Sequence, residues 1–180
     1  HSPFFGAIIG RVINRISKGE FSLNGSKYTL PVNRPPNHLH GGSEGFGTSL
    51  WDVKTNKNEN SVTFFIESKH SHQGYPGNVD ASVKYTLSGN YLSIEMFANV
   101  DKPTPINMGQ HNYFNLSSID EINSDYNVCN HQLYINSSSY TETDNNLIPT
   151  GNFIKTKDSS MDFSELKNIN KIKLDDNFIL

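Results

Sequence analysis

Two histidines stand one residue apart in the segment PPNHLHGGSEGFG, residues 35–47, and a carboxylate follows the second after four residues. Strand positions i and i+2 share a face, so His38 and His40 are expected to point the same way if this segment is extended. With Glu44 they would offer two imidazoles and a carboxylate to a divalent metal, and His111 would be a further ligand. The alternative is an irregular loop, rich in glycine and proline, that simply holds polar side chains.

A second candidate for chemistry is TPINMGQHNYFNL, residues 104–116, where His111 stands between apolar and aromatic residues. A partly buried histidine can be a structural hydrogen-bonding group. It can also be a general acid, because the unperturbed pKa of histidine lies near neutral pH. Tyr113 and Phe114 would then form a wall for the apolar face of a sugar, or else belong to the core.

Charged residues in two further segments are candidates for ligand binding. In GRVINRI, residues 10–16, Arg11 and Arg15 would share a face of a strand, with Asn14 opposite Arg15. The two arginines form a surface pair, or Arg15 is a fixed donor of several hydrogen bonds to ligand hydroxyls. In LDDNF, residues 174–178, the paired aspartates suit a cation, sugar hydroxyls or a turn.

The elements that must position these residues are strands. Apolar and polar residues alternate in several short segments, as is typical of half-buried strands. Asn24-Gly25 predicts a type I′ hairpin turn and Ser88-Gly89-Asn90 a second turn. A turn of helix is expected only near MDFSELKNI, residues 161–169. The segments with strand alternation are 19–30, which holds the first turn, and 61–68, 78–87, 91–100 and 131–136. Together they predict an all-β fold, a sandwich or a barrel.

The composition limits the classes of protein to which this chain can belong. The 180 residues suffice for one domain with a core, and the net charge of −3 with no basic stripe gives no reason to expect nucleic acid. The only cysteine, Cys129, rules out an intrachain disulfide. No apolar run approaches the roughly 20 residues that span a bilayer, and no signal peptide is visible. A cytoplasmic protein is therefore expected. Both ends resemble truncations inside a domain, because the chain opens in an apolar segment and stops at DDNFIL. The sequence is therefore expected to be a piece of a larger domain.

The candidate segments, taken in order, resemble the blocks of the galactose mutarotase (aldose 1-epimerase) family. The matching segments are SPFFGAIIGRVINRI, NHLHGGSEGFGTSLW, GYPG, TPINMGQHNYFNL, YTETDNNLIPTG and LDDNF. The resemblance implies that residues 1–180 are a partial aldose 1-epimerase domain, lacking N-terminal and C-terminal parts. It implies a large antiparallel β-sandwich that interconverts the α and β anomers of free aldoses, typically galactose and glucose. It also implies that no metal or organic cofactor takes part.

The family's site residues carry over by position. The resemblance makes His111 the general acid and His40 a supporting residue. It makes Asn14 and Arg15 the Asn-Arg pair of the sugar pocket. Tyr75 matches the aromatic position of the Gly-aromatic-Pro-Gly turn, and Asp175 matches the short aspartate motif; both are expected to bind substrate. Mutarotation needs a base at the anomeric hydroxyl and an acid at the ring oxygen. The family's base is a glutamate expected beyond Leu180, so this chain alone is expected to be inactive.

Two departures from the family pattern affect these assignments. Gln110 stands where the family commonly has asparagine before the acid histidine, and its extra methylene would move a supporting hydrogen bond. Asp176 stands where the family often has histidine, and its negative charge would raise the pKa of nearby groups.

Three alternatives remain open. The first is a sugar-binding module without turnover. The second is a hexose-6-phosphate epimerase of the same superfamily, which would need extra cationic residues for the phosphate, where only Arg11 and Arg15 are available. The third is a cupin-like metalloprotein that uses His38, His40, Glu44 and His111. The partner expected in the leading interpretation is a small aldohexose, with no nucleic acid and no membrane.

Overall fold

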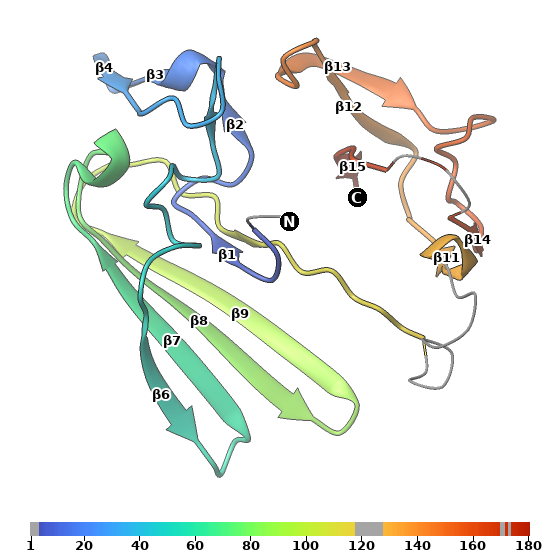
Figure 1. Cartoon of the computed structure of the whole chain (residues 1–180), viewed down its shortest axis with the longest axis horizontal. Coiled ribbons are helices and arrows are strands. Elements are labelled where there is room, and N and C mark those ends of the chain that lie inside the picture. The colour runs from blue at the N-terminus through green and yellow to red at the C-terminus, as the bar shows by residue number, and fades with distance from the viewer. Residues whose placement is uncertain (1–3, 118–127, 170–171, 173) are drawn as a thin grey trace. The chain divides into compact units, whose positions relative to one another are not determined.

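The computed structural model describes residues 4–117, 128–169, 172 and 174–180, and Figure 1 traces them as strands and a few short 3-10 turns. The chain divides into two compact units, residues 1–112 and residues 113–180. Every strand ladder in the described residues is antiparallel, and the one parallel pairing is an isolated bridge between Val12 and Asn107. The predicted all-β class is confirmed. Within the described part of the chain, no helix is long and apolar enough to cross a membrane.

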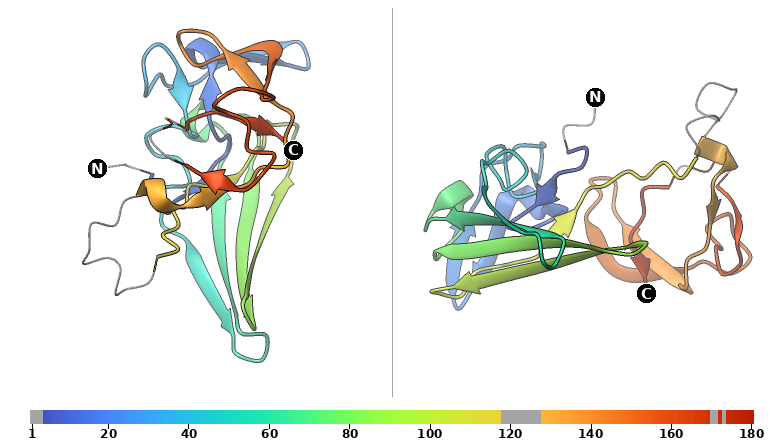
Figure 2. Two further views of the ribbon diagram at one scale, coloured as in Figure 1. Left: turned by 90° about the vertical axis from the view of Figure 1, so that its right-hand side faces the viewer. Right: turned by 90° about the horizontal axis from the view of Figure 1, so that it is seen from below.

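The first unit contains a four-stranded sheet in the order β6 (Asp52–Asn56), β7 (Ser61–Ser68), β8 (Val79–Ser88) and β9 (Tyr91–Val100). Its strands lie side by side in both views of Figure 2. The sequence predictions for 61–68, 78–87 and 91–100 agree with β7, β8 and β9 to within one residue. The alternation that indicated these strands also defines the apolar face of the sheet.

The core of this unit forms where that apolar face is covered. Phe46, Val79 and Ala81 are buried together, and partly buried side chains, Trp51 among them, pack against them. Trp51 meets Phe46 edge to face, with ring centroids 5.6 Å apart, and its indole N–H donates to the Phe46 carbonyl at 2.9 Å. This contact anchors residues 46–51, which follow the segment with His38 and His40, to the sheet.

The first predicted hairpin is present. Strands β3 (Glu20–Leu23) and β4 (Ser26–Thr29) pair in antiparallel register, following the 3-10 turn η1 (Ser17–Gly19). Asn24 and Gly25 have φ values of 50° and 78°. Positive φ at both central residues is what a type I′ turn requires, so the predicted turn is confirmed.

Short strands in the first unit carry the candidate site. β1 (Ile8–Ile9) pairs with β10 (Gly109–Gln110), and β2 (Arg15–Ile16) pairs with β5 (His38–Leu39). The 3-10 turn η2 (His72–Gly74) leads into the Gly-Tyr-Pro-Gly turn. Each ladder joins segments far apart in sequence, so the ladders bring distant blocks together.

The second unit holds a three-stranded sheet in the order β13 (Pro149–Lys155), β12 (Ser139–Thr143) and β15 (Phe178–Ile179). A two-stranded ladder joins β11 (Gln132–Leu133), which follows the 3-10 turn η4 (Val128–Asn130), to β14 (Lys167–Asn168). The strand expected over 131–136 is thus two residues long. The expected helical turn at 161–169 is wrong: this stretch holds turns and β14.

Candidate functional site

His40 and Asn14 are held against each other by a reciprocal pair of hydrogen bonds just beyond the β2–β5 ladder. The His40 N–H donates to the Asn14 carbonyl at 3.0 Å, and the Asn14 N–H donates to His40 Nδ1 at 3.0 Å. Both residues have left-handed backbones, with φ of 54° at His40 and 65° at Asn14. Asparagine tolerates this conformation better than most residues. One of these bonds holds the His40 backbone and the other holds its imidazole through Nδ1.

His111 reaches the same place through the β1–β10 ladder. That ladder continues past its last strand residues, since the His111 N–H donates to the Ala7 carbonyl at 2.9 Å and the Gly6 N–H to the His111 carbonyl at 3.0 Å. The His40 and His111 rings meet edge to face, with centroids 5.4 Å apart and planes at 87°. Two histidines separated by 71 positions in the sequence thus form one pair.

Arg15 and Asn14 lie beside this pair. The Arg15 guanidinium Nη1 donates to Asn14 Oδ1 at 3.3 Å, so the two side chains meet on one side of the backbone. The expectation that Asn14 would lie opposite Arg15 is wrong, because the left-handed φ at Asn14 breaks strand alternation at that residue. An amide and a guanidinium next to two imidazoles form a cluster of hydrogen-bond donors suited to hydroxyl groups.

The contacts of His40 determine which of its ring nitrogens carries the proton. Nδ1 accepts the Asn14 N–H, so in the neutral ring the proton is on Nε2. Burial, followed by the nearby His111 and Arg15, lowers the pKa of His40 to about 4. At neutral pH the ring is an uncharged donor through Nε2.

Substituting His40 by asparagine, which tolerates the left-handed backbone, is expected to reduce the acid sensitivity of the fold. The pKa of His40 is lowered in the folded state, so its contribution to stability is complete above about pH 6.5 and is lost as pH falls toward 4. Calorimetry at pH 7 and pH 4.5 should therefore show a smaller drop in Tm for His40→Asn than for the wild type, by about 2 °C or more. An equal drop in both proteins would contradict the buried, neutral state of His40.

The glycines after His40 are required by close backbone packing. Gly41 has φ of 81°, and a Cβ at this position would lie 1.8 Å from the Gly10 carbonyl oxygen. Any other residue would displace one of two backbone segments. Gly41 therefore lets the segment that carries His40 pass directly over the segment that leads to Asn14.

His38 does not share the position of His40. It is fully buried, its Nδ1 donates to the Pro31 carbonyl at 2.7 Å, and its Nε2 accepts the hydroxyl of Tyr75 at 2.8 Å. Burial lowers the pKa of His38 and raises that of Tyr75, so both are neutral. His38 is thus an interior residue, and it holds β5 in place two residues before the chain turns at His40.

Removing the Tyr75 hydroxyl is expected to destabilise the first unit. In Tyr75→Phe the buried Nε2 of His38 loses its donor, and an unsatisfied buried acceptor costs about 1–3 kcal/mol. Urea unfolding followed by circular dichroism measures the change. Tyr91→Phe, at a β9 position that is 81% exposed, is the matched control and should change stability by less than about 0.5 kcal/mol. Equal stability of the two variants would contradict the buried bond.

Arg11 is also buried, at 2% exposure. Its guanidinium donates to the carbonyls of Ser68, Lys69 and Pro76, each at 2.8 Å. The expectation that Arg11 and Arg15 share a face is therefore wrong. Arg11 supports the turn that carries Tyr75, so it is not available to a phosphate, and the hexose-6-phosphate alternative loses one of its two cations.

The alternative metal set is not assembled among the described residues. Both ring nitrogens of His38 are engaged in the interior, and a carboxylate oxygen of Glu44 accepts the amide of Gln73 at 3.3 Å. His38 and His40 do not point the same way, because the left-handed φ of His40 ends the strand after Leu39. No three histidine, cysteine, aspartate or glutamate residues in the described ranges group as metal ligands.

Tyr75, Asp175 and Gln110 are the remaining sequence candidates. Tyr75 is in the first unit but in its interior, where it contacts His38 and lies 5.7 Å from the Arg11 guanidinium carbon. Asp175 belongs to the second unit, where it is exposed ahead of β15, and its N–H donates to an Asp176 carboxylate oxygen at 3.4 Å. Gln110 is on β10, and its side-chain carbonyl accepts the amide of Asn112.

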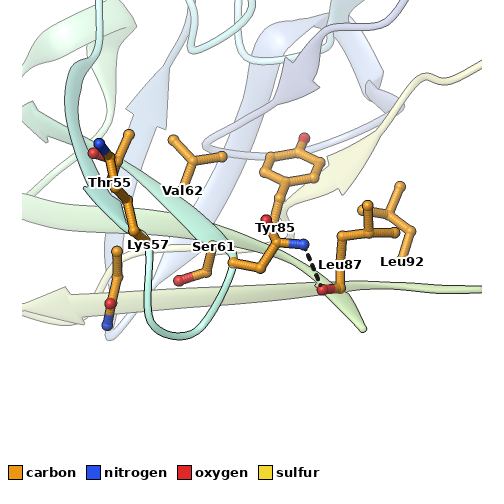
Figure 3. A pocket seen from close by; sticks show the side chains of 9 residues that line it. Thr55, Lys57, Ser61, Val62, Tyr85, Leu87 and Leu92 are labelled. Atoms are coloured by element: carbon orange, nitrogen blue, oxygen red, sulfur yellow. Dashed lines mark hydrogen bonds between the residues drawn. The ribbon is translucent and has the colours of Figure 1, made fainter. Parts of the chain in front are cut away.

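The hollows on the four-stranded sheet are separate from the histidine pair. One of about 430 Å³ is lined by Val62, Tyr85, Leu87 and Leu92 together with polar residues of the β6–β7 turn, as Figure 3 shows. Another of about 710 Å³ is lined mainly by apolar residues, including Phe46 and Trp51. Neither is lined by His40 or His111, so neither is assigned to a sugar.

The comparisons with known proteins all indicate the same family. The family model described as aldose 1-epimerase matches residues 1–180. Galactose mutarotase of Mus musculus is 44% identical over 149 residues, which are 83% of this chain and 42% of that protein. Aldose 1-epimerase of Escherichia coli strain K12 is 40% identical over 167 residues, 92% of this chain and 46% of that protein. The chain thus spans a little under half the length of these curated relatives.

Solved structures agree with this result. A GalM/aldose epimerase homologue from C. elegans superposes with a TM-score of 0.88 at 30% identity, covering all of this chain and 56% of that one. Galactose 1-epimerase from Lactobacillus acidophilus NCFM superposes with a TM-score of 0.83 at 26% identity, covering 94% of this chain and 49% of that one. The fold therefore matches known structures over nearly its whole length.

Proposed function

The chain belongs to the aldose 1-epimerase family, and on this premise we propose that the protein interconverts the α and β anomers of free aldohexoses such as galactose and glucose. The observation that supports this most directly is the pair of imidazoles, His40 and His111, with ring centroids 5.4 Å apart. Mutarotation consists of proton transfers, and histidine is the side chain best suited to proton transfer near neutral pH.

In the proposed mechanism His111 is the general acid. A base removes the proton of the anomeric hydroxyl while His111 gives a proton to the ring oxygen, and the C1–O5 bond breaks. Rotation about C1–C2 and reclosure by the reverse proton transfers yield the other anomer. The proposal assigns the base to a glutamate that the family resemblance places after Leu180, outside this sequence. No metal or cofactor is part of the proposal.

His40 is proposed to hold the sugar and not to exchange protons with it. Its Nδ1 is occupied by the Asn14 N–H at 3.0 Å, so Nε2–H is left as a fixed donor to a sugar oxygen. A neutral donor fixed in place orients the substrate without competing for the proton that His111 transfers.

The remaining contacts to the sugar are proposed to come from Asn14, Arg15 and Asp175. An amide, a guanidinium and a carboxylate together supply both donors and acceptors to hydroxyl groups. Tyr75 is proposed to act indirectly, since its hydroxyl binds His38 in the interior. The proposal treats both units as parts of one family domain, because the family model spans them.

The cellular setting is also part of the proposal. A role in galactose metabolism in the cytoplasm fits the family and a sequence with one cysteine, Cys129. A small aldohexose is the proposed partner, with no nucleic acid and no membrane.

Polarimetry tests the proposed reaction. Freshly dissolved α-galactose or α-glucose is added to the complete gene product, and the approach to anomeric equilibrium is expected to be faster than in buffer. A folded sample that gives only the buffer rate would refute the proposal. If that sample still bound hexoses saturably, the sugar-binding module without turnover would replace it.

A further inference from the structure

Phe4 contacts both imidazoles of the candidate site. Its ring meets His40 edge to face, with centroids 4.6 Å apart and planes at 74°. It lies nearly parallel to the ring of His111, with centroids 5.9 Å apart and planes at 23°. Together with the contact of 5.4 Å between the imidazoles, these distances close a triangle of three rings.

The backbone fixes Phe4 at this place. The Ala7 N–H donates to the Phe4 carbonyl at 3.0 Å, which closes a tight turn directly before β1. The next hydrogen bonds along the chain, at Gly6 and Ala7, are those that join this segment to His111. Phe4 and His111 are therefore set by one ladder, whereas His40 is set by the separate β2–β5 ladder.

We propose that Phe4 is a positioning residue that locks His111 and His40 in their mutual orientation and excludes water from the side of His40 that it covers. The inference rests on the proposed function, in which His111 transfers a proton and His40 holds the sugar. The Asn14 N–H already holds Nδ1 of His40, and Phe4 adds a rigid aromatic ring in contact with both imidazoles.

The polar surroundings of His40 show why an apolar contact matters there. The charged or titratable groups that face it are His111 and Arg15, and the Asn14 N–H occupies Nδ1. A cation close to His40 disfavours its protonated form, and exclusion of water disfavours that form further. The Phe4 ring lies 4.6 Å from that of His40, so it contributes to keeping His40 a neutral donor.

The test is an NMR titration of the histidine side chains combined with kinetics on the complete gene product. The variants are Phe4→Ala, which removes the ring, and Phe4→Leu, which keeps apolar bulk without a flat ring. Phe5→Ala is the matched control, because this neighbouring side chain is 69% exposed. His40→Asn identifies the His40 resonances.

In Phe4→Ala the titration midpoint of His40 is expected to rise by about one pH unit, since water gains access to the ring. The acid limb of the kcat profile should move upward with it, and kcat at neutral pH should fall about tenfold or more with little change in KM. Phe4→Leu should keep most of the His40 titration but lose kcat, because leucine cannot stack on the His111 ring as Phe4 does. Phe5→Ala should match the wild type in all three measurements.

The inference is overturned if Phe4→Ala and Phe4→Leu titrate and turn over as the wild type does. It is also overturned if they lose stability while kcat and the pH profile of the folded enzyme stay unchanged, because the role of Phe4 is then structural only. If the wild type shows no mutarotase activity, the proposed function is refuted, and the catalytic part of this inference falls with it. The NMR titration would still measure the effect of Phe4 on the pKa of His40.

Discussion

His111→Ala is expected to lower kcat for mutarotation by about 10²–10⁴-fold, the range typical for loss of a general acid. The ring opens only if the ring oxygen receives a proton as the C1–O5 bond breaks, and without the imidazole that proton must come from water. Because the interaction is made in the transition state, kcat and kcat/KM should fall together. Polarimetry on freshly dissolved α-galactose measures both constants.

Two controls separate the acid role of His111 from a structural one. Added imidazole should restore part of the rate of His111→Ala, because a small imidazole can occupy the space left beside Phe4. His70→Ala is the comparison for histidine loss in general; His70 accepts the Gly77 N–H at 2.9 Å in another turn, and its removal should leave kcat within about twofold. A wild-type rate for His111→Ala would refute the assigned role.

Arg11→Met is expected to cost on the order of 3–5 kcal/mol of stability, the range for breaking a buried charged network. Burial lowers the pKa of Arg11 to about 10, so the guanidinium is still charged at neutral pH. Besides its three bonds to carbonyls, it donates to Ser68 Oγ at 2.9 Å and to Thr104 Oγ1 at 3.3 Å. Methionine fills similar space but leaves these acceptors without a donor in the interior.

Thermal unfolding by calorimetry measures the effect of Arg11→Met. Arg11→Lys should lie between the wild type and Arg11→Met, since an ammonium keeps the charge but cannot reach acceptors on several sides. Arg34→Met is the control, because Arg34 is exposed, and it should change stability by less than about 0.5 kcal/mol. If Arg11→Met unfolds at the same temperature as Arg34→Met, the buried network does not support the fold.

The long strands could be predicted because their signal is local. β7, β8 and β9 each alternate over eight to ten residues, and alternation is set by burial of one face of the sheet. The signal for the type I′ turn is equally local, because it depends only on Asn24 and Gly25. At 161–169 the apolar spacing was misleading: Asp162 Oδ1 accepts from both the Ser164 N–H and its hydroxyl. Such local bonds compete with a helix.

The site could not be assembled from the sequence pattern alone. His40 and His111 meet through two separate ladders of two residues each, too short to leave a periodic signal. Their selection depended on the family resemblance. A surface pair was one of the two interpretations for Arg11 and Arg15; arginine is almost never fully buried, and only a cage of carbonyls makes the burial of Arg11 stable. Phe4 gave no signal beyond being one of many aromatic residues.

The contact between Trp51 and Phe46 makes it possible to follow unfolding of the first unit by intrinsic tryptophan fluorescence. Trp51 is the only tryptophan in the 180 residues and packs edge-on against Phe46 in the first unit. Its fluorescence will therefore follow loss of the packing around Phe46, whereas melting confined to residues 113–180 will leave it largely unchanged. Comparing the emission midpoint with the calorimetric one would show whether the two units unfold together.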